Sequence, residues 1–137
     1  MMNLRIAELS YTKNETIEMG RILIVDDEMD ICIMLSKYLR SLNFEADYVS
    51  TVKQTMQNID AHLYDVLFVD LNLLEESGYD VIDYVKSLNL TSKIVVISAH
   101  DSEATRAINK GADIFIAKPF TIRTINEALK TLQVLPS

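Results

Sequence analysis

Residues of the types that bind metal ions and phosphoryl groups stand at the ends of short apolar runs. They are Asp26, Asp27, Asp70, Ser98 and Lys118. Three carboxylates in one pocket would repel each other, and a hard divalent cation such as Mg²⁺ would remove that repulsion. Lys118 would supply a fixed positive charge and Ser98 a hydroxyl donor. Together these groups suit the transfer of a phosphoryl group to a carboxylate, because the migrating oxyanions need electrostatic stabilisation more than acid–base catalysis.

The apolar runs predict the strands that position these residues. Four runs are continuous and rich in Ile and Val, which is typical of strands covered on both faces, and they are Ile22–Val25, Val66–Val69, Ile94–Ile97 and Ile114–Ala117. A fifth, Phe44–Val49, alternates like an edge strand. Apolar residues at helical spacing lie between the runs and after the last. The sequence therefore reads as five β-α units, too few for an eight-fold barrel, and predicts an open doubly wound α/β fold.

Strand order decides whether the polar residues meet. Ligands of open α/β sheets bind at the carboxyl ends of the strands, in the crevice where the strand order reverses. We predict a flavodoxin-like five-stranded parallel sheet of order 2-1-3-4-5, whose crevice lies between strands 1 and 3. Those are the two strands that end in aspartates, so Asp26, Asp27 and Asp70 should converge.

Composition excludes several classes of function. The chain has 137 residues, which favours one domain, and its 13 Lys+Arg against 20 Asp+Glu give a net charge of −7. That charge argues against a nucleic-acid or anionic-membrane partner. Three glycines cannot build a Walker A or dinucleotide loop, and two histidines without metal-ligand spacing make zinc an unfavoured cofactor. A single cysteine and the lack of a targeting or membrane segment favour the cytoplasm.

The first 19 residues differ from the rest. They are mixed polar and precede the first strand. We expect residues 1–19 to form a poorly ordered arm, with a short docking helix as the alternative, and residues 20–137 to form the domain.

Five pieces of the sequence carry a resemblance to a known family. They are RILIVDDE at 21–28, VLFVDLNL at 66–73, Gly78 eight residues after Asp70, VVISA at 95–99 and GADIFIAKPF at 111–120. In this order, at the predicted strand ends, they resemble the receiver domain of two-component response regulators, of the stand-alone, chemotaxis-regulator-like type. The likeness covers residues 20–135, and such a fold matches the one predicted from the strands.

The resemblance implies roles for the residues at the strand ends. Asp70 would be the phosphoacceptor, and Mg²⁺ (or Mn²⁺ in its place) would be held by Asp27 directly, by Asp26 mainly through water, by Asp70 and by the backbone carbonyl of Asn72. Lys118 would pair with the acceptor and then with the phosphoryl oxygens.

Further positions of the family's pattern imply a switch. Ser98 and Phe115 stand at its switch positions, and the bond from Lys118 to Pro119 would be cis. Asn72 and His100 occupy the positions that tune hydrolysis of the acyl phosphate, where His100 could either position or block the attacking water. Two departures are Leu74, where receivers often carry Pro, and Phe115, which lacks the hydroxyl of a Tyr.

The implied function is a signalling switch rather than an enzyme with a separate substrate. The donor would be a sensor histidine kinase or a phosphotransfer protein. Phosphorylation would reshape the face made by the fourth helix, the fifth strand and the fifth helix (residues 104–132), and that face would control a protein partner. No direct contact with nucleic acid or membrane is expected, and the chain would be a monomer or a phosphorylation-dependent dimer.

Two other functions remain open from the sequence. One is a small Mg²⁺-dependent phosphohydrolase with an aspartate nucleophile, although Glu28 rather than Asp stands two residues after Asp26 and a cap domain is missing. The other is a receiver-shaped interaction module that takes no phosphate, which the full set of site residues disfavours.

Overall fold

The computed structural model describes residues 20–136, so the predicted N-terminal arm at 1–19 lies outside the described part. Its main sheet has five parallel strands in the order β2-β1-β3-β6-β7, which confirms the predicted order of 2-1-3-4-5 for the main strands. These strands are β1 (Gly20–Val25), β2 (Phe44–Val49), β3 (Val66–Asp70), β6 (Lys93–Ser98) and β7 (Ile114–Ala117).

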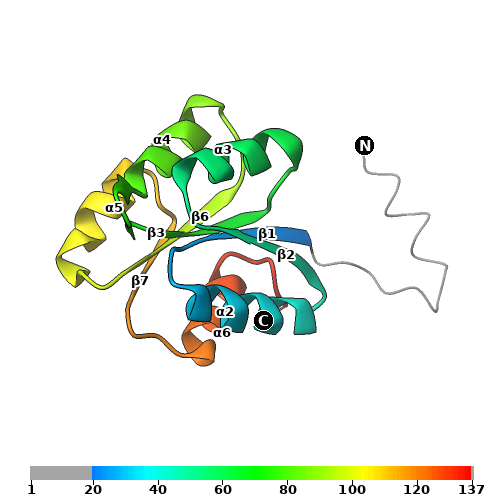
Figure 1. Ribbon diagram of the computed structural model, residues 1–137. Coiled ribbons are helices and arrows are strands. Elements are labelled where there is room, and N and C mark those ends of the chain that lie inside the picture. Colours follow the sequence, from blue (N-terminus) through cyan, green and yellow to red (C-terminus); the bar gives the residue numbers. More distant parts are fainter. Residues whose placement is uncertain (1–19, 137) are drawn as a thin grey trace.

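Helices cover both faces of the sheet (Figure 1). The helices are α2 (Met29–Ser41), α3 (Val52–Ala61), α4 (Tyr79–Ser87), α5 (Ala104–Lys110) and α6 (Ile122–Thr131), and a 3-10 turn, η1 (Asp101–Glu103), precedes α5. Helices α2 and α6 pack over one face, and α3, α4 and α5 over the other. The chain between β3 and α4 adds a short hairpin of β4 (Asn72–Leu73) and β5 (Glu76–Ser77), which the sequence analysis did not predict.

The core lies in two layers because the inner strands are apolar on both sides. Strand β3 is buried along its whole length, whereas β2 alternates between buried and exposed positions as predicted for an edge strand. Each buried aliphatic side chain contributes about 1.5–3 kcal/mol, so the buried strands are a main source of the domain's stability. Among the described residues, no helix has the length and apolar character needed to cross a membrane.

Two threonines set where helices begin beside the carboxyl edge of the sheet. Thr51 accepts a hydrogen bond from the Gln54 backbone N–H (3.1 Å), and Thr121 accepts one from the Thr124 backbone N–H (3.3 Å). Such N-caps satisfy amide groups that a helix leaves unpaired in its first turn. Helix α6 thus begins a few residues after β7, which holds the loop carrying Lys118 over the sheet edge.

Candidate functional site

The three aspartates converge at the carboxyl ends of β1 and β3, as their positions in the sequence predicted. One carboxylate oxygen from each of Asp26, Asp27 and Asp70 lies within 4.8 Å of the others. Asp26 and Asp70 are buried, at 2% and 4% exposed, and Asp27 is half-buried. Oxygen ligands at this spacing, on the rigid ends of neighbouring strands, can hold a divalent cation.

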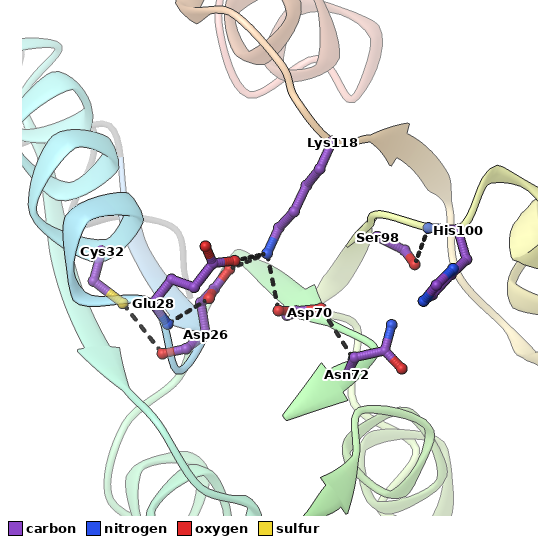
Figure 2. Close-up of polar contacts among 8 residues, drawn as sticks. All are labelled: Asp26, Glu28, Cys32, Asp70, Asn72, Ser98, His100 and Lys118. Atoms are coloured by element: carbon purple, nitrogen blue, oxygen red, sulfur yellow. Dashed lines mark hydrogen bonds and ion pairs between the residues drawn. The ribbon is translucent and has the colours of Figure 1, made fainter. Parts of the chain in front are cut away.

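Backbone amides orient the two buried carboxylates. Asp26 Oδ1 accepts a hydrogen bond from the Glu28 backbone N–H (2.8 Å), and Asp70 Oδ1 accepts one from the Asn72 backbone N–H (3.0 Å). Each aspartate is thereby fixed by the residue two positions later. The second oxygen of each, Oδ2, is left to face the middle of the pocket, where Lys118 reaches it (Figure 2).

Lys118 enters the pocket from the end of β7, and its peptide bond to Pro119 is cis. Its Nζ lies 3.0 Å from Asp70 Oδ2 and 3.2 Å from Asp26 Oδ2. Burial alone would lower the pKa of Lys118, but hydrogen bonds to Glu28 and Asp70 and the charge of Asp26 raise it above its ordinary value. The ammonium is therefore charged at neutral pH and offsets part of the repulsion among the carboxylates.

Glu28 is a member of this pocket that sequence reasoning missed as a partner of Lys118. Its Oε1 lies 2.6 Å from Lys118 Nζ, closer than either aspartate, while its side chain is 59% exposed. Glu28 is also the N-cap residue of α2. The only signal in the sequence was its place directly after the two aspartates, which did not reveal that it would meet a residue 90 positions away.

A cation fits the pocket on the evidence of the buried oxygens themselves. Asp26 Oδ2 is the one buried side-chain oxygen or nitrogen in residues 20–136 with no hydrogen-bond partner, since Lys118 approaches it as an ion pair without hydrogen-bond geometry. Burial, with a smaller contribution from the charge of Asp70, raises the pKa of Asp26 to about 6. A divalent ion bound here would give this buried oxygen a partner and would favour the ionised form of Asp26.

This raised pKa predicts an unusual pH dependence for the metal-free protein. The pKa of Asp26 would be near its ordinary value of 3.8 in the unfolded chain and about 6 in the folded protein. Between these values the folded state holds the extra proton, so the contribution of Asp26 to the free energy of unfolding should fall as pH rises, by up to about 2–3 kcal/mol. Urea denaturation in EDTA across this range should show the fall in wild type but not in Asp26→Asn. Equal slopes for the two proteins would contradict the assignment.

The remaining predicted residues lie on the other side of Asp70. Ser98 is fully buried at the end of β6, and its Oγ accepts a hydrogen bond from the His100 backbone N–H (3.0 Å). Asn72 and His100 are exposed, and both line a cavity of about 260 Å³ beside the pocket. Phe115 is half-buried on β7, opposite Val96, and packs toward the core under α3, α4 and α5.

Comparison with known sequences agrees with this geometry. A family model described as the response regulator receiver domain matches residues 22–130. The sensory transduction protein LytR of Staphylococcus saprophyticus is 34% identical over 115 residues, which cover 82% of this chain and 45% of that protein. LytR of Staphylococcus epidermidis is 30% identical with the same coverage. The chain therefore spans less than half the length of these two relatives.

Solved structures agree as well. The response regulator TrrA of Thermotoga maritima, in complex with Mg²⁺-BeF, is 25% identical with a TM-score of 0.74, covering 82% of this chain and 97% of that one. A CheY-like receiver domain from Methylobacillus flagellatus is 26% identical with a TM-score of 0.75, covering 85% and 99%. The chain belongs to the response regulator receiver domain family and is a phosphoacceptor signalling module of two-component systems rather than an enzyme with a separate substrate.

Proposed function

We propose that Asp70 accepts a phosphoryl group from a sensor histidine kinase or a phosphotransfer protein in a Mg²⁺-dependent reaction. The observation that carries this assignment is the position of Asp70 between the two halves of the site. Its Oδ2 lies 3.0 Å from Lys118 Nζ, Asp26 and Asp27 lie on one side, and β6 with Ser98 at its end pairs with β3 on the other. Of the three aspartates, Asp70 alone lies on the strand that pairs with β6, the strand that ends at Ser98.

The ion would be held by Asp27 directly, by Asp26 mainly through water, by Asp70 and by the backbone carbonyl of Asn72, and Mn²⁺ could substitute. When bound, it would supply positive charge to the attacking carboxylate and to the phosphoryl oxygens. The complex of TrrA with Mg²⁺-BeF supports this cofactor, because that chain shares the fold and 25% of its sequence with this one.

In the transfer itself, a carboxylate oxygen of Asp70 forms a new O–P bond while the N–P bond of the donor's phosphohistidine breaks. The departing imidazole keeps the bonding electron pair and takes up a proton. Lys118 follows the charge from the Asp70 carboxylate to the phosphoryl oxygens, where its ammonium counters the developing charge. Because a kinase phosphorylates the histidine of the donor with ATP, the transfer to Asp70 would take place in the cytoplasm.

The switch follows from the charge that phosphorylation adds, about −1.5 to −2. Ser98 Oγ now accepts from the His100 backbone N–H, so its own proton is free to be donated to a phosphoryl oxygen. Movement of Ser98 would open space that Phe115 fills by turning inward. The face of α5, β7 and α6 would change shape and control a protein partner, with the phosphoryl contact of Ser98 providing the differential free energy. Asn72 and His100 would tune the hydrolysis rate.

The test is phosphorylation of the intact chain by acetyl phosphate with Mg²⁺. Intact mass should increase by one phosphoryl group per chain, peptide mapping should assign it to Asp70, and EDTA should prevent it. Release of inorganic phosphate from small esters over many turnovers would instead favour the phosphohydrolase. Failure to take up phosphate or to bind beryllofluoride with Mg²⁺ would favour the phosphate-independent interaction module.

An exposed apolar face of α2, formed by Met29, Ile33 and Met34, supports a protein as the phosphoryl donor. These side chains are 54%, 45% and 38% exposed, and Ile33 and Met34 border a groove of about 470 Å³ that Ile122 also lines. Helix α2 begins directly after the acidic residues of the pocket, so a protein donor that presents a phosphohistidine to Asp70 would extend over this face. Apolar side chains at the centre of an interface are the ones that contribute most to binding.

We therefore expect Ile33→Lys to slow phosphotransfer from the cognate donor by about tenfold, because it buries a charge in the interface. Phosphorylation by acetyl phosphate should stay at the wild-type rate, since the pocket is intact. Ile108→Lys is the matched control, because Ile108 is equally exposed at 45% but lies on α5. Equal slowing by the two variants would contradict a donor surface on α2.

A further inference from the structure

A hydrogen bond joins the two chain segments that border the phosphoacceptor. The Tyr79 hydroxyl donates to Glu103 Oε1 at 2.6 Å. Tyr79 is the first residue of α4 and Glu103 is the last of η1, so the bond connects the segment after Asp70 with the segment after Ser98. Tyr79 is buried, and its ring lines the 260 Å³ cavity beside the pocket.

Arg106 completes this cluster. Its guanidinium carbon lies 4.3 Å from the centre of the Tyr79 ring, and its Nη1 lies 3.6 Å from Glu103 Oε1. The carboxylate of Glu103 thus contacts both the Tyr79 hydroxyl and the Arg106 guanidinium, and that guanidinium makes a cation–π contact with the face of the Tyr79 ring. We call Tyr79, Glu103 and Arg106 the tyrosine latch.

On one side, the latch is fixed to the backbone of Asp70. The Gly78 backbone N–H donates to the Leu71 carbonyl (2.9 Å), and a Cβ built on Gly78 would lie only 2.2 Å from the Asp70 carbonyl oxygen. The start of α4 at Gly78 therefore lies directly against the backbone of Asp70.

On the other side, the latch is connected to Ser98 by consecutive hydrogen bonds. The Glu103 backbone N–H donates to the His100 carbonyl (3.0 Å), and the His100 backbone N–H donates to Ser98 Oγ (3.0 Å). A displacement of Ser98 toward Asp70 that keeps this hydrogen bond carries His100 with it and so changes the position of Glu103 relative to Tyr79.

We propose that Tyr79 and Glu103 are positioning residues that hold the segment of residues 98–103 in its resting place and so oppose the movement of Ser98 toward a phosphoryl group. The inference rests on the proposed role of Asp70. Because α4 is held against the Asp70 backbone, it cannot follow the moving segment, and the bond from Tyr79 to Glu103 must lengthen or break during switching. The strength of the latch thus sets how much of the free energy of phosphoryl binding the conformational change consumes.

The test compares two tyrosines of the same helix. Tyr79→Phe removes the hydroxyl but keeps the ring under Arg106, whereas Tyr84→Phe removes an equivalent bond, from Tyr84 to Asp60 Oδ1 at 2.7 Å, which points to α3 instead. Beryllofluoride is titrated into each protein with saturating Mg²⁺ and followed by amide NMR at Ser98 and His100. We expect Tyr79→Phe to reach its midpoint at about fivefold lower beryllofluoride, the effect of one hydrogen bond to a charged group in a partly wet site. Tyr84→Phe should match wild type.

Two further measurements separate positioning from a general structural role. In the free Tyr79→Phe protein, the amide resonances of Ser98 and His100 should lie part of the way toward their beryllofluoride-bound positions. Glu103→Ala should lower the midpoint as well, and combining it with Tyr79→Phe should add little, because both remove one interaction.

A wild-type midpoint in Tyr79→Phe, or an equal shift in Tyr84→Phe, would overturn the latch while leaving the phosphoacceptor role intact. If wild type itself takes up no beryllofluoride at Asp70, the proposed function fails first and the latch fails with it.

Discussion

Asp70→Asn is expected to abolish phosphorylation while leaving the fold intact. The amide has nearly the shape of the carboxylate, so the hydrogen bond from the Asn72 backbone N–H and the packing of β3 are kept. An amide oxygen is a poor nucleophile and carries no charge for a cation, so labelling by acetyl phosphate with Mg²⁺ should fall below detection. Intact mass spectrometry over a time course measures this directly.

The same substitution should stabilise the metal-free protein. The charge of Asp70 is one of the causes that raise the pKa of Asp26, and removing it should lower that pKa toward its ordinary value. The gain in the free energy of unfolding is limited because the substitution also removes the ion pair between Asp70 and Lys118. Lys118 still keeps Asp26 and Glu28 as partners. We expect an increase of about 1 kcal/mol in the free energy of unfolding in EDTA, a typical effect of relieving one close like-charge contact.

Two control variants distinguish an acceptor from a cation ligand. Asp26→Asn should need more Mg²⁺ but should still be labelled when Mg²⁺ is saturating, whereas no Mg²⁺ concentration should rescue Asp70→Asn. Asp101→Asn removes an exposed carboxylate from η1 near the same edge of the sheet and should behave as wild type. Labelling of Asp70→Asn at the wild-type rate would show that another residue is the acceptor.

The sequence predicted the sheet and the meeting of its acids for a simple physical reason. Strands buried on both faces must be continuously apolar, so Val66–Val69 could be recognised without any partner strand. Once the strand order was inferred, the residue after each strand had to lie at the same edge. The convergence of Asp26 with Asp70 therefore depended only on topology, not on the rotamer of any side chain.

Contacts made by long side chains could not be predicted in this way. The approach of Glu28 to Lys118 and the bond from Tyr79 to Glu103 depend on how far a side chain at a helix start reaches across the edge of the sheet. No periodicity marks such a residue, and an exposed Glu at a helix start is ordinary in composition.

The hairpin between Asp70 and α4 was missed because strands of two residues carry no pattern. Leu74, the departure noted where receivers often have Pro, is 86% exposed between its two strands. Glu76 anchors the hairpin from the other side, where its Oε1 accepts a hydrogen bond from the Val52 backbone N–H (3.0 Å) at the start of α3. The segment after Asp70 is thus held by an antiparallel strand pair and by a hydrogen bond to the first turn of α3.

Gly78→Ala is expected to cost both stability and phosphorylation, because the chain has no space for a methyl group at this position. The new Cβ would lie 2.2 Å from the Asp70 carbonyl oxygen and 2.9 Å from Leu71 Cα, and both are backbone atoms that cannot rotate away. The backbone of Gly78 is helical, with φ of −62°, so alanine suffers no conformational strain and the whole effect is steric. Overpacking of this kind costs about 2–3 kcal/mol.

Relief of that clash must push α4 and Asp70 apart, which displaces the carboxylate from Lys118. Gly111→Ala is the matched control: its φ of +121° strains an alanine by roughly 1–3 kcal/mol, but its Cβ would meet only the flexible end of Lys86. Urea denaturation should show both variants destabilised, whereas only Gly78→Ala should raise the beryllofluoride midpoint. If Gly78→Ala bound beryllofluoride as tightly as Gly111→Ala at equal stability loss, close packing of α4 on Asp70 would not be a requirement of the site.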